Sequence, residues 1–221
     1  MGNLAPTHWV TGSSSILGCF TDWGNVTEED LLNGNHSPLW NYLATKILAE
    51  TAAWKFATAH PSLDLTTINP PFIYGPLHTD FPTPEKTRLG ANGMIYALLS
   101  GALPPQLAPF YCDVRDVARA HVQSLKATQV GEQKRFLISG GAFTWKDAVG
   151  YLSVVRPELA ARLPSAEGAK ALPGPLVATD ISPAESVLGM DERNYITWKK
   201  SVGDAVDSIL LAEKEWGKKS L

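Results

Sequence analysis

Residues 63–76 have the sequence LDLTTINPPFIYGP, in which an apolar and β-branched run stops at two adjacent prolines. The run LTTI, residues 65–68, is typical of a strand that lies inside a sheet. A proline lacks the N–H group that a sheet ladder needs, so the two prolines end the strand. We therefore expect a buried strand that is followed by NPPFIYGP, residues 69–76.

Patterns typical of strands and helices alternate on both sides of this segment. Apolar residues recur at helical spacing in several stretches. Helices are expected over residues 40–59, 92–100, 115–127, 145–155, 183–189 and 198–215. Strands are expected over residues 8–11, 65–68, 110–114 and 134–139. Alternation of this kind predicts an α/β fold with a parallel sheet flanked by helices.

The composition excludes several classes of function. The chain has 221 residues, with 19 Lys and Arg against 22 Asp and Glu and no block of like charge, so we expect no nucleic-acid partner. Its apolar runs fall short of the roughly 18 residues that a membrane helix needs, and no signal-peptide pattern is visible. Cys19 and Cys112 lie far apart, which disfavours a zinc site or a disulfide. We expect a cytoplasmic protein with no membrane partner and no metal.

A tyrosine and a lysine share one face of the helix expected over residues 40–59. Tyr42 and Lys46 stand four positions apart in YLATK, so the phenol and the ammonium can address the same small volume. An ammonium close to a phenol favours the phenolate, which makes the phenol a usable proton donor or acceptor. The same spacing occurs on many surface helices, so the pair alone carries little weight.

Two further segments could complete a site. The hydroxyl cluster TGSSS, residues 11–15, follows an expected strand, where a serine can donate a hydrogen bond to a substrate carbonyl oxygen. The alternative is a turn in which these hydroxyls satisfy nearby backbone amides. NPPFIYGP ends the next strand, and open α/β sheets bind ligands at the carboxyl ends of their strands. The three elements in this order are more specific than any one of them.

Four stretches together resemble the extended short-chain dehydrogenase/reductase family, within the NAD-dependent epimerase/dehydratase superfamily. The similarity is greatest to the dihydroflavonol-reductase and methylglyoxal-reductase-like group, and it is weakest after about residue 155. The matching stretches are TGSSSILG at 11–18, YLATKILAETAAWKF at 42–56, LTTINPPFIYGP at 65–76 and FYCDVRDVARAHV at 110–122.

The resemblance implies a reductase that transfers a hydride from NADPH to an aldehyde or ketone. Tyr42 would protonate the forming alkoxide, and Lys46 would hold the nicotinamide ribose hydroxyls, so both residues would touch the cofactor. Ser13 would orient the substrate carbonyl, or Ser14 if the alignment shifts by one residue. Thr45 stands where the family usually has a serine, which keeps the hydroxyl.

Other positions carry over to the cofactor site by resemblance. Pro70, Phe72 and Ile73 match the stretch whose backbone meets the nicotinamide. Asn92 stands near a family position that contacts the cofactor phosphates. The choice of NADP over NAD comes from the resemblance alone.

The family also has a glycine-rich nucleotide turn that this sequence does not show. Gly12 and Gly18 frame TGSSSILG, but Tyr42 follows Gly18 by only 24 residues. The intervening βα units, at about 30 residues each, could not fit there, so this stretch is the serine-bearing strand end. We therefore expect an N-terminally truncated family member that lacks on the order of 100 residues.

The resemblance divides the chain into two parts. Residues 1–76 and 108–140 would form the C-terminal part of a Rossmann domain, and residues 77–107 and 141–221 a smaller lobe that binds the substrate. Two alternative functions stay open. The missing turn favours a non-catalytic remnant or a partner of full-length paralogues, and a nucleotide-sugar epimerase or dehydratase would use the same serine, tyrosine and lysine.

Three polar residues near the FYCDV strand have structural explanations. Asp113 and Asp116 flank a helix start, where carboxylates cap exposed N–H groups and suit the helix dipole. His121 is expected to be a packed or surface histidine rather than a catalytic base.

Overall fold

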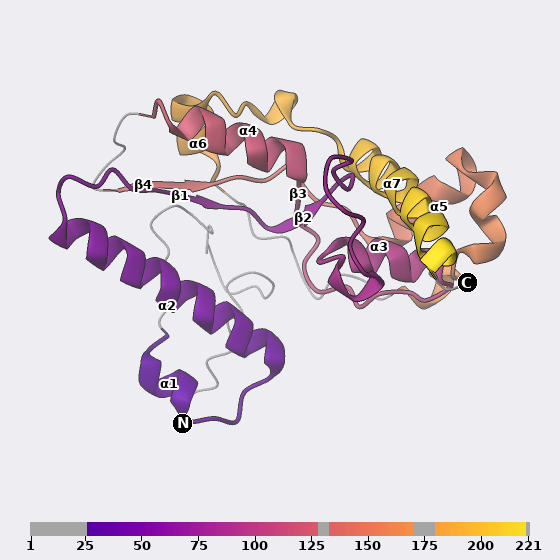
Figure 1. Ribbon diagram of the computed structural model, residues 1–221, viewed down its shortest axis with the longest axis horizontal. Coiled ribbons are helices and arrows are strands. Elements are labelled where there is room, and N and C mark those ends of the chain that lie inside the picture. Colours follow the sequence, from indigo (N-terminus) through magenta and orange to yellow (C-terminus); the bar gives the residue numbers. More distant parts are fainter. Residues whose placement is uncertain (1–25, 128–132, 170–179, 220–221) are drawn as a thin grey trace.

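A computed structural model describes residues 26–127, 133–169 and 180–219 of the chain. Its strands form two short parallel pairs that follow one another across the molecule (Figure 1). The pairs are β1 (Thr66–Asn69) with β4 (Lys134–Leu137), and β2 (Phe72–Tyr74) with β3 (Tyr111–Asp113). The parallel pairing agrees with the sequence prediction.

Strand β2 is the main difference from the expected elements. The chain leaves β1 at Pro70 and Pro71 as predicted, and then three residues resume an extended course beside β3. Phe72 lies opposite Tyr111 in this register. The other expected strands among the described residues are found within one or two residues of their predicted bounds. The strand expected over 8–11 lies outside the described residues.

Six helices lie close to the positions expected above, and a short helix, α1, precedes them among the described residues. The helices are α1 (Glu28–Leu32), α2 (Pro38–Ala59), α3 (Asn92–Leu99), α4 (Val114–Ser124), α5 (Trp145–Val155), α6 (Ser182–Leu188) and α7 (Trp198–Lys219). Short 3-10 turns cover Lys86–Arg88, Pro157–Arg162, Ala166–Gly168 and Glu192–Asn194.

Local sequence signals fix the bounds of α2. The Ser37 side chain accepts a hydrogen bond from the Trp40 backbone N–H at 3.2 Å, and Pro38 occupies the first turn. Both features are favoured at helix starts, since Ser37 satisfies an exposed donor and Pro38 needs none. At the other end, Pro61 disfavours helical geometry in His60, which becomes the C-cap.

Helices cover both faces of the β1–β4 pair. Figure 1 shows α2 on one face and α4 with α6 on the other. Buried side chains join α4, α6, β3 and β4 into one cluster. Its members are Cys112, Ala120, Phe136, Ile138, Ala184, Leu188, Met190 and Tyr195. Helix α6 therefore packs with the sheet, although the expected division places residues 141–221 in the lobe.

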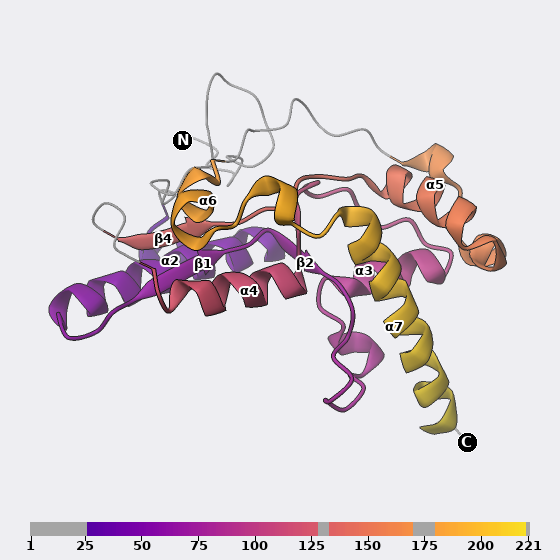
Figure 2. The ribbon, with the colours of Figure 1, turned by 90° about the horizontal axis from the view of Figure 1, so that it is seen from above.

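A second and larger core lies beyond the ends of β2 and β3. Figure 2 shows α3, α5 and α7 gathered there. Tyr74 of β2 and Tyr111 of β3 are buried in this core, where both pack edge-on against Phe143. The helical part built by α3, α5 and α7, called the lobe below, is thus joined directly to these two strands.

Candidate active site

Helix α2 presents Tyr42 and Lys46 on one exposed face. The Lys46 Nζ atom lies 5.4 Å from the centroid of the Tyr42 ring. The Tyr42 side chain is 57% exposed, and neither the phenol nor the ammonium has a hydrogen bond or ion pair to another described residue, although the Tyr42 carbonyl accepts the Thr45 hydroxyl. The phenol and the ammonium are therefore side by side and available to a ligand.

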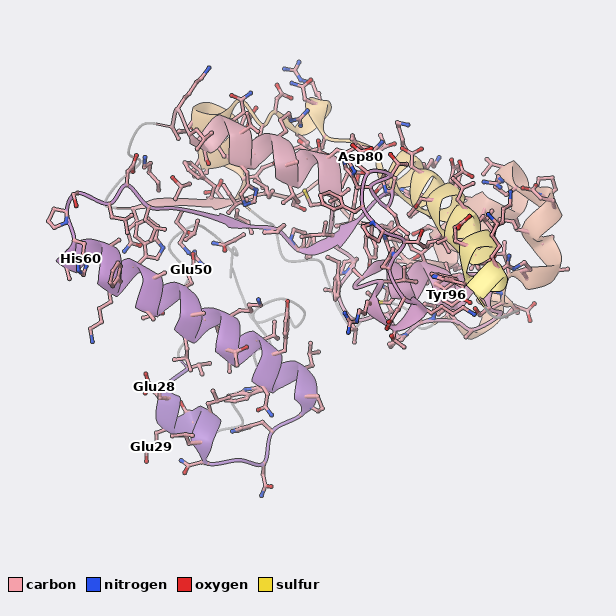
Figure 3. All side chains as sticks on the ribbon, in the orientation of Figure 1. Glu28, Glu29, Glu50, His60, Asp80 and Tyr96 are labelled. Atoms are coloured by element: carbon pink, nitrogen blue, oxygen red, sulfur yellow. The ribbon has the colours of Figure 1, made fainter. Side chains whose placement is uncertain are left out.

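The direction of α2 places this pair at one particular end of the sheet. The helix runs antiparallel to β1, so its first turns lie toward the end of β1 at which Pro70 follows (Figure 1). Figure 3 shows Glu50 on the side of α2 that faces the strands and His60 at the far end of the helix. Tyr42 and Lys46 precede Glu50 on α2, so they lie on the half of the helix that points toward the carboxyl end of β1 (Figure 1).

Glu50 binds α2 to both strands beneath it. Its carboxylate accepts hydrogen bonds from Thr67 Oγ1 at 2.7 Å and Asn69 Nδ2 at 3.0 Å in β1. It also accepts from Arg135 Nε at 2.9 Å and Nη2 at 3.0 Å in β4. Burial by itself would raise the pKa of Glu50, but the bonds from Arg135, Asn69 and Thr67 outweigh it and lower that pKa.

The backbone after β1 carries three of the residues expected at the cofactor. Pro70 is half-buried between β1 and β2. Phe72 is half-buried, with its ring stacked at 6.3 Å from that of Tyr74. Ile73 is 37% exposed on the opposite face of β2. The structure describes these positions without a ligand, so their role toward a cofactor stays a prediction.

Asn92 opens α3 with a buried side chain. Its Nδ2 atom donates to the Gly75 carbonyl at 2.8 Å, and its Oδ1 atom is buried without a hydrogen-bond partner among the described residues. The amide therefore ties the start of α3 to the backbone that follows β2. Contact of Asn92 with cofactor phosphates stays a prediction.

Gly75 itself is a residue that the sequence analysis did not single out. Its φ of +137° is a conformation that side chains disfavour. A Cβ atom at this position would lie 2.8 Å from Val114 Cγ1 and 3.2 Å from Asp113 Oδ2. The turn after β2 needs a glycine because the backbone passes close to the start of α4.

The acidic residues around α4 differ in what they bind. Asp113 caps the helix as expected, accepting the Arg115 backbone N–H at 2.8 Å. Asp116 does not act as a cap, because its carboxylate accepts the Ile196 N–H at 2.8 Å and faces Arg119 at 3.0 Å. Burial raises the pKa of Asp116. His121 is an exposed histidine as expected, with Nδ1 2.8 Å from its own helix backbone.

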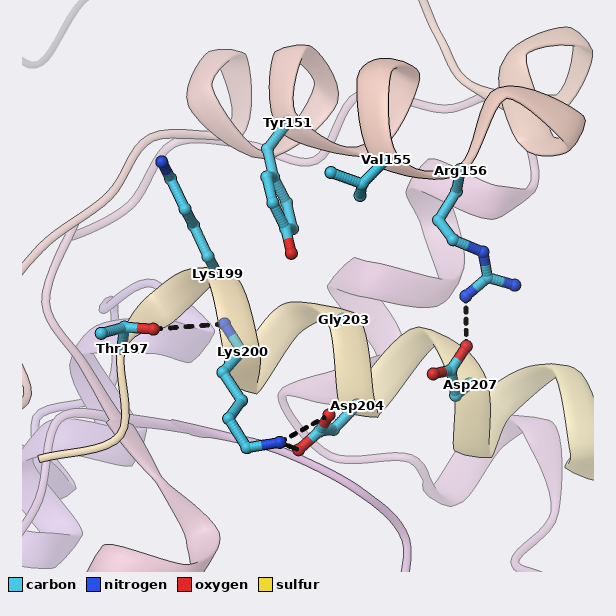
Figure 4. A pocket seen from close by; sticks show the side chains of 9 residues that line it. All are labelled: Tyr151, Val155, Arg156, Thr197, Lys199, Lys200, Gly203, Asp204 and Asp207. Carbon is cyan, nitrogen blue, oxygen red and sulfur yellow. Dashed lines mark hydrogen bonds and ion pairs between the residues drawn. The ribbon is translucent and has the colours of Figure 1, made fainter.

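Two open grooves lie away from the tyrosine and lysine. One, of about 470 Å³, runs between α5 and α7 and is lined by charged side chains (Figure 4). The other, of about 450 Å³, follows α2 past Trp54. Neither is lined by Tyr42, Lys46 or residues 70–73, so the candidate site lies outside both grooves.

Ser13, its alternative Ser14 and Cys19 lie outside the described residues. Within the described ranges there is no group of three or more His, Cys, Asp or Glu side chains placed to hold a metal ion. Among the helices of the described residues, none is both long and apolar enough to cross a bilayer.

Comparison with known proteins places this geometry in a family. Residues 5–139 match the NAD dependent epimerase/dehydratase family. Ketoreductase azaE of Aspergillus niger is 37% identical over 196 residues, covering 86% of this chain and 55% of that protein. The NADPH-dependent methylglyoxal reductase GRE2 of Saccharomyces cerevisiae is 30% identical over 200 residues, covering 86% of this chain and 56% of that protein.

The solved structures agree with the sequence relatives. The yeast methylglyoxal/isovaleraldehyde reductase Gre2 complexed with NADPH superposes with a TM-score of 0.72 at 26% identity, covering 89% of this chain and 57% of that one. The chain thus spans little more than half the length of these relatives. The expected α/β, Rossmann-type fold and the resemblance to extended short-chain reductases are confirmed. This chain belongs to the NAD dependent epimerase/dehydratase family.

Proposed function

We propose that this chain carries the catalytic tyrosine and lysine of an NADPH-dependent reductase of aldehydes or ketones. The observation that carries the proposal is the pair of Tyr42 and Lys46 side chains, which are exposed and have no other side-chain partner among the described residues. They lie on the half of α2 that points toward the carboxyl end of β1 (Figure 1). The printed names of the relatives, a ketoreductase and an NADPH-dependent methylglyoxal reductase, support this reaction class.

The donor set at this end of the sheet fits a nicotinamide dinucleotide. The exposed Lys46 ammonium suits the ribose hydroxyls, and the backbone of residues 70–73 offers carbonyl and amide groups for a carboxamide. Asn92 completes the proposed set at the phosphates. When bound, NADPH supplies a hydride, and with it two electrons, to the carbonyl carbon of the substrate.

The residues of this chain control the proton in the proposed reaction. Tyr42 gives its hydroxyl proton to the carbonyl oxygen, which becomes the hydroxyl of the product alcohol. The Lys46 ammonium, beside the ring, stabilises the phenolate left behind. The phenolate then takes a proton from solvent, which restores the starting state. Ser13 would donate a hydrogen bond to the same carbonyl oxygen and so orient it for attack.

We assign the rest of the chain accordingly. Residues 1–76 and 108–140 would hold the cofactor, and the segments 77–107 and 141–221 would shape the pocket for a small carbonyl substrate, apart from α6, which packs with the sheet. A cytoplasmic location is supported by the free thiol of Cys112, since cysteines stay reduced in that compartment.

Binding and turnover of the 221-residue chain test the proposal. Nicotinamide fluorescence would follow an NADPH titration, and NADPH oxidation would be followed with a panel of aldehydes and ketones that includes methylglyoxal. We expect saturable binding and turnover. Tyr42→Phe should lower turnover by about 100-fold or more while weakening NADPH binding far less.

Two outcomes would contradict the proposal. A folded chain that binds no NADPH up to millimolar concentration would favour the non-catalytic alternative. A Tyr42→Phe variant that turns over as fast as the wild type would exclude the tyrosine as proton donor.

A further inference from the structure

Helix α7 contacts the backbone beyond β2 and β3 through two polar side chains. Asp204 Oδ2 lies 2.6 Å from Arg115 Nη1, and Ser208 Oγ accepts the Leu77 backbone N–H at 3.0 Å. The two side chains are four residues apart, so they lie on one face of α7. Arg115 follows β3 and Leu77 follows β2, so this face of the lobe reaches both strand ends.

Arg115 is held in place from the sheet side. Its Nε and Nη2 atoms donate to the two oxygens of Asp113, both at 2.8 Å, which is the bidentate geometry that fixes a guanidinium in orientation. Asp113 is fully buried and also accepts the Arg115 backbone N–H. The remaining guanidinium N–H groups therefore point in a direction set by β3, and Asp204 of α7 accepts one of them.

Helices α3 and α7 of the lobe also hold the backbone that follows β2. The Gly75 carbonyl accepts the Asn92 amide of α3 at 2.8 Å. Two residues later, Ser208 of α7 binds the Leu77 N–H and donates its own proton to the Ala205 carbonyl at 2.9 Å. The first and last helices of the lobe thus hold the chain that continues the strand carrying Phe72 and Ile73.

We propose that Asp204 and Ser208 are positioning residues that set the lobe against the carboxyl ends of β2 and β3 and thereby set the affinity for the carbonyl substrate. This rests on the proposed function, in which the segments 77–107 and 141–221, which contain the helices of the lobe, shape the substrate pocket. The residues proposed to hold the cofactor lie on α2, the 70–73 backbone and the start of α3. Loosening α7 should therefore weaken substrate binding more than cofactor binding.

The chain offers a matched control one turn further along α7. Asp207 pairs with Arg156, the C-cap residue of α5, so this ion pair joins α7 to the end of α5 within the lobe and does not reach the sheet (Figure 4). Asp204 also pairs with Lys200 in its own helix at 3.0 Å (Figure 4). Removing Asp207 perturbs the charge of α7 as much as removing Asp204, but leaves the contact with Arg115 in place.

The experiment compares Asp204→Ala, Ser208→Ala and the control Asp207→Ala with the wild-type chain. Three quantities are measured: KM and kcat for a carbonyl substrate, the Kd for NADPH, and amide hydrogen exchange of residues 74–77. For Asp204→Ala and Ser208→Ala we expect KM to rise about two- to tenfold, the size of one lost hydrogen bond, with kcat and the NADPH Kd changed less than about twofold. Exchange of the Leu77 amide should accelerate in Ser208→Ala and be restored by Ser208→Thr, which keeps the hydroxyl.

The results separate this inference from the proposed function. A wild-type chain that reduces no carbonyl would overturn the proposed function and the positioning role with it. In an active chain, unchanged KM in Asp204→Ala and Ser208→Ala would overturn the positioning role alone. The same conclusion would follow if Asp207→Ala raised KM as much as Asp204→Ala.

Discussion

Glu50 and Arg135 face each other across the interface between α2 and β4, with the guanidinium donating to both carboxylate oxygens at 2.9 and 3.0 Å. The Glu50 side chain is 14% exposed and the Arg135 side chain 13%. A paired geometry of this kind is stronger in a partly buried position than at the surface. Tyr42 lies two turns before Glu50 on α2, and Lys46 lies one turn before it. The Glu50–Arg135 ion pair therefore also fixes where the candidate catalytic face of α2 lies.

Replacing Glu50 by glutamine should make stability less dependent on pH. Burial alone would raise the pKa of Glu50, but its hydrogen bonds hold it below the ordinary value of about 4.3. The stabilisation is therefore complete above the unfolded-state pKa and is lost as pH falls through the folded-state pKa. Glu50→Gln should lower the free energy of unfolding by about 2 kcal/mol at neutral pH.

Urea unfolding of Glu50→Gln and the wild type at neutral pH and near pH 3 checks this. The difference between the two proteins should shrink at the lower pH, because the Glu50 carboxyl of the unfolded wild type binds a proton there and its charge then contributes less to folding. A difference of the same size at both pH values would show that shape, and not charge, accounts for the loss.

Local signals explain which elements could be predicted from the sequence. The strand β1 and the start of α2 depend on residues adjacent in the chain, namely a β-branched run and a serine followed by proline. Strand β2 could not be predicted, because three residues after a double proline pair only with a strand that comes much later in the chain.

The candidate site likewise contains local features, which the sequence predicts, and contacts between distant segments, which it does not. Tyr42 and Lys46 could be placed on one face because i, i+4 spacing on a helix is a local property. The Glu50 contacts and the Asn92 bond to Gly75 join segments that are far apart in sequence. Such contacts leave no periodic signal, so they became visible only in the structure.

Lys46 should matter for cofactor binding in a way that another lysine on α2 does not. Lys46→Ala removes the ammonium beside Tyr42 and should weaken NADPH binding about tenfold, the effect of roughly 1.4 kcal/mol. Lys55→Ala is the control, since Lys55 is an exposed lysine more than two turns along the same helix. Both variants are compared by NADPH fluorescence titration, and equal affinities would remove Lys46 from the proposed cofactor site.

Gly75→Ala should destabilise the fold by about 2 kcal/mol or more. The φ of +137° is strained for alanine, and its Cβ would meet Val114 Cγ1 at 2.8 Å. Gly150→Ala is the matched control, because Gly150 is an exposed helical glycine with nothing within 4 Å of an added Cβ. That change should be neutral or stabilise by up to about 1 kcal/mol. The melting temperatures of both variants, measured by thermal unfolding, test this prediction. Equal melting temperatures would contradict the close approach at Gly75.

Asn92→Asp should destabilise the chain at neutral pH, and the loss should shrink in acid. An ionised carboxylate cannot donate to the Gly75 carbonyl, and at this buried position it would face that oxygen with like partial charge. The substitution therefore leaves a buried charge unpaired, which costs about 3 kcal/mol. Burial raises the pKa of such a carboxyl above its unfolded value, so the folded state binds the proton more tightly and regains stability as pH falls.

Asn41→Asp, at an exposed position on α2, is the control and should change stability by less than about 0.5 kcal/mol. Urea unfolding at neutral and acid pH measures both effects, and a pH-independent loss in Asn92→Asp would mean that its side chain turns out to solvent instead of remaining against Gly75.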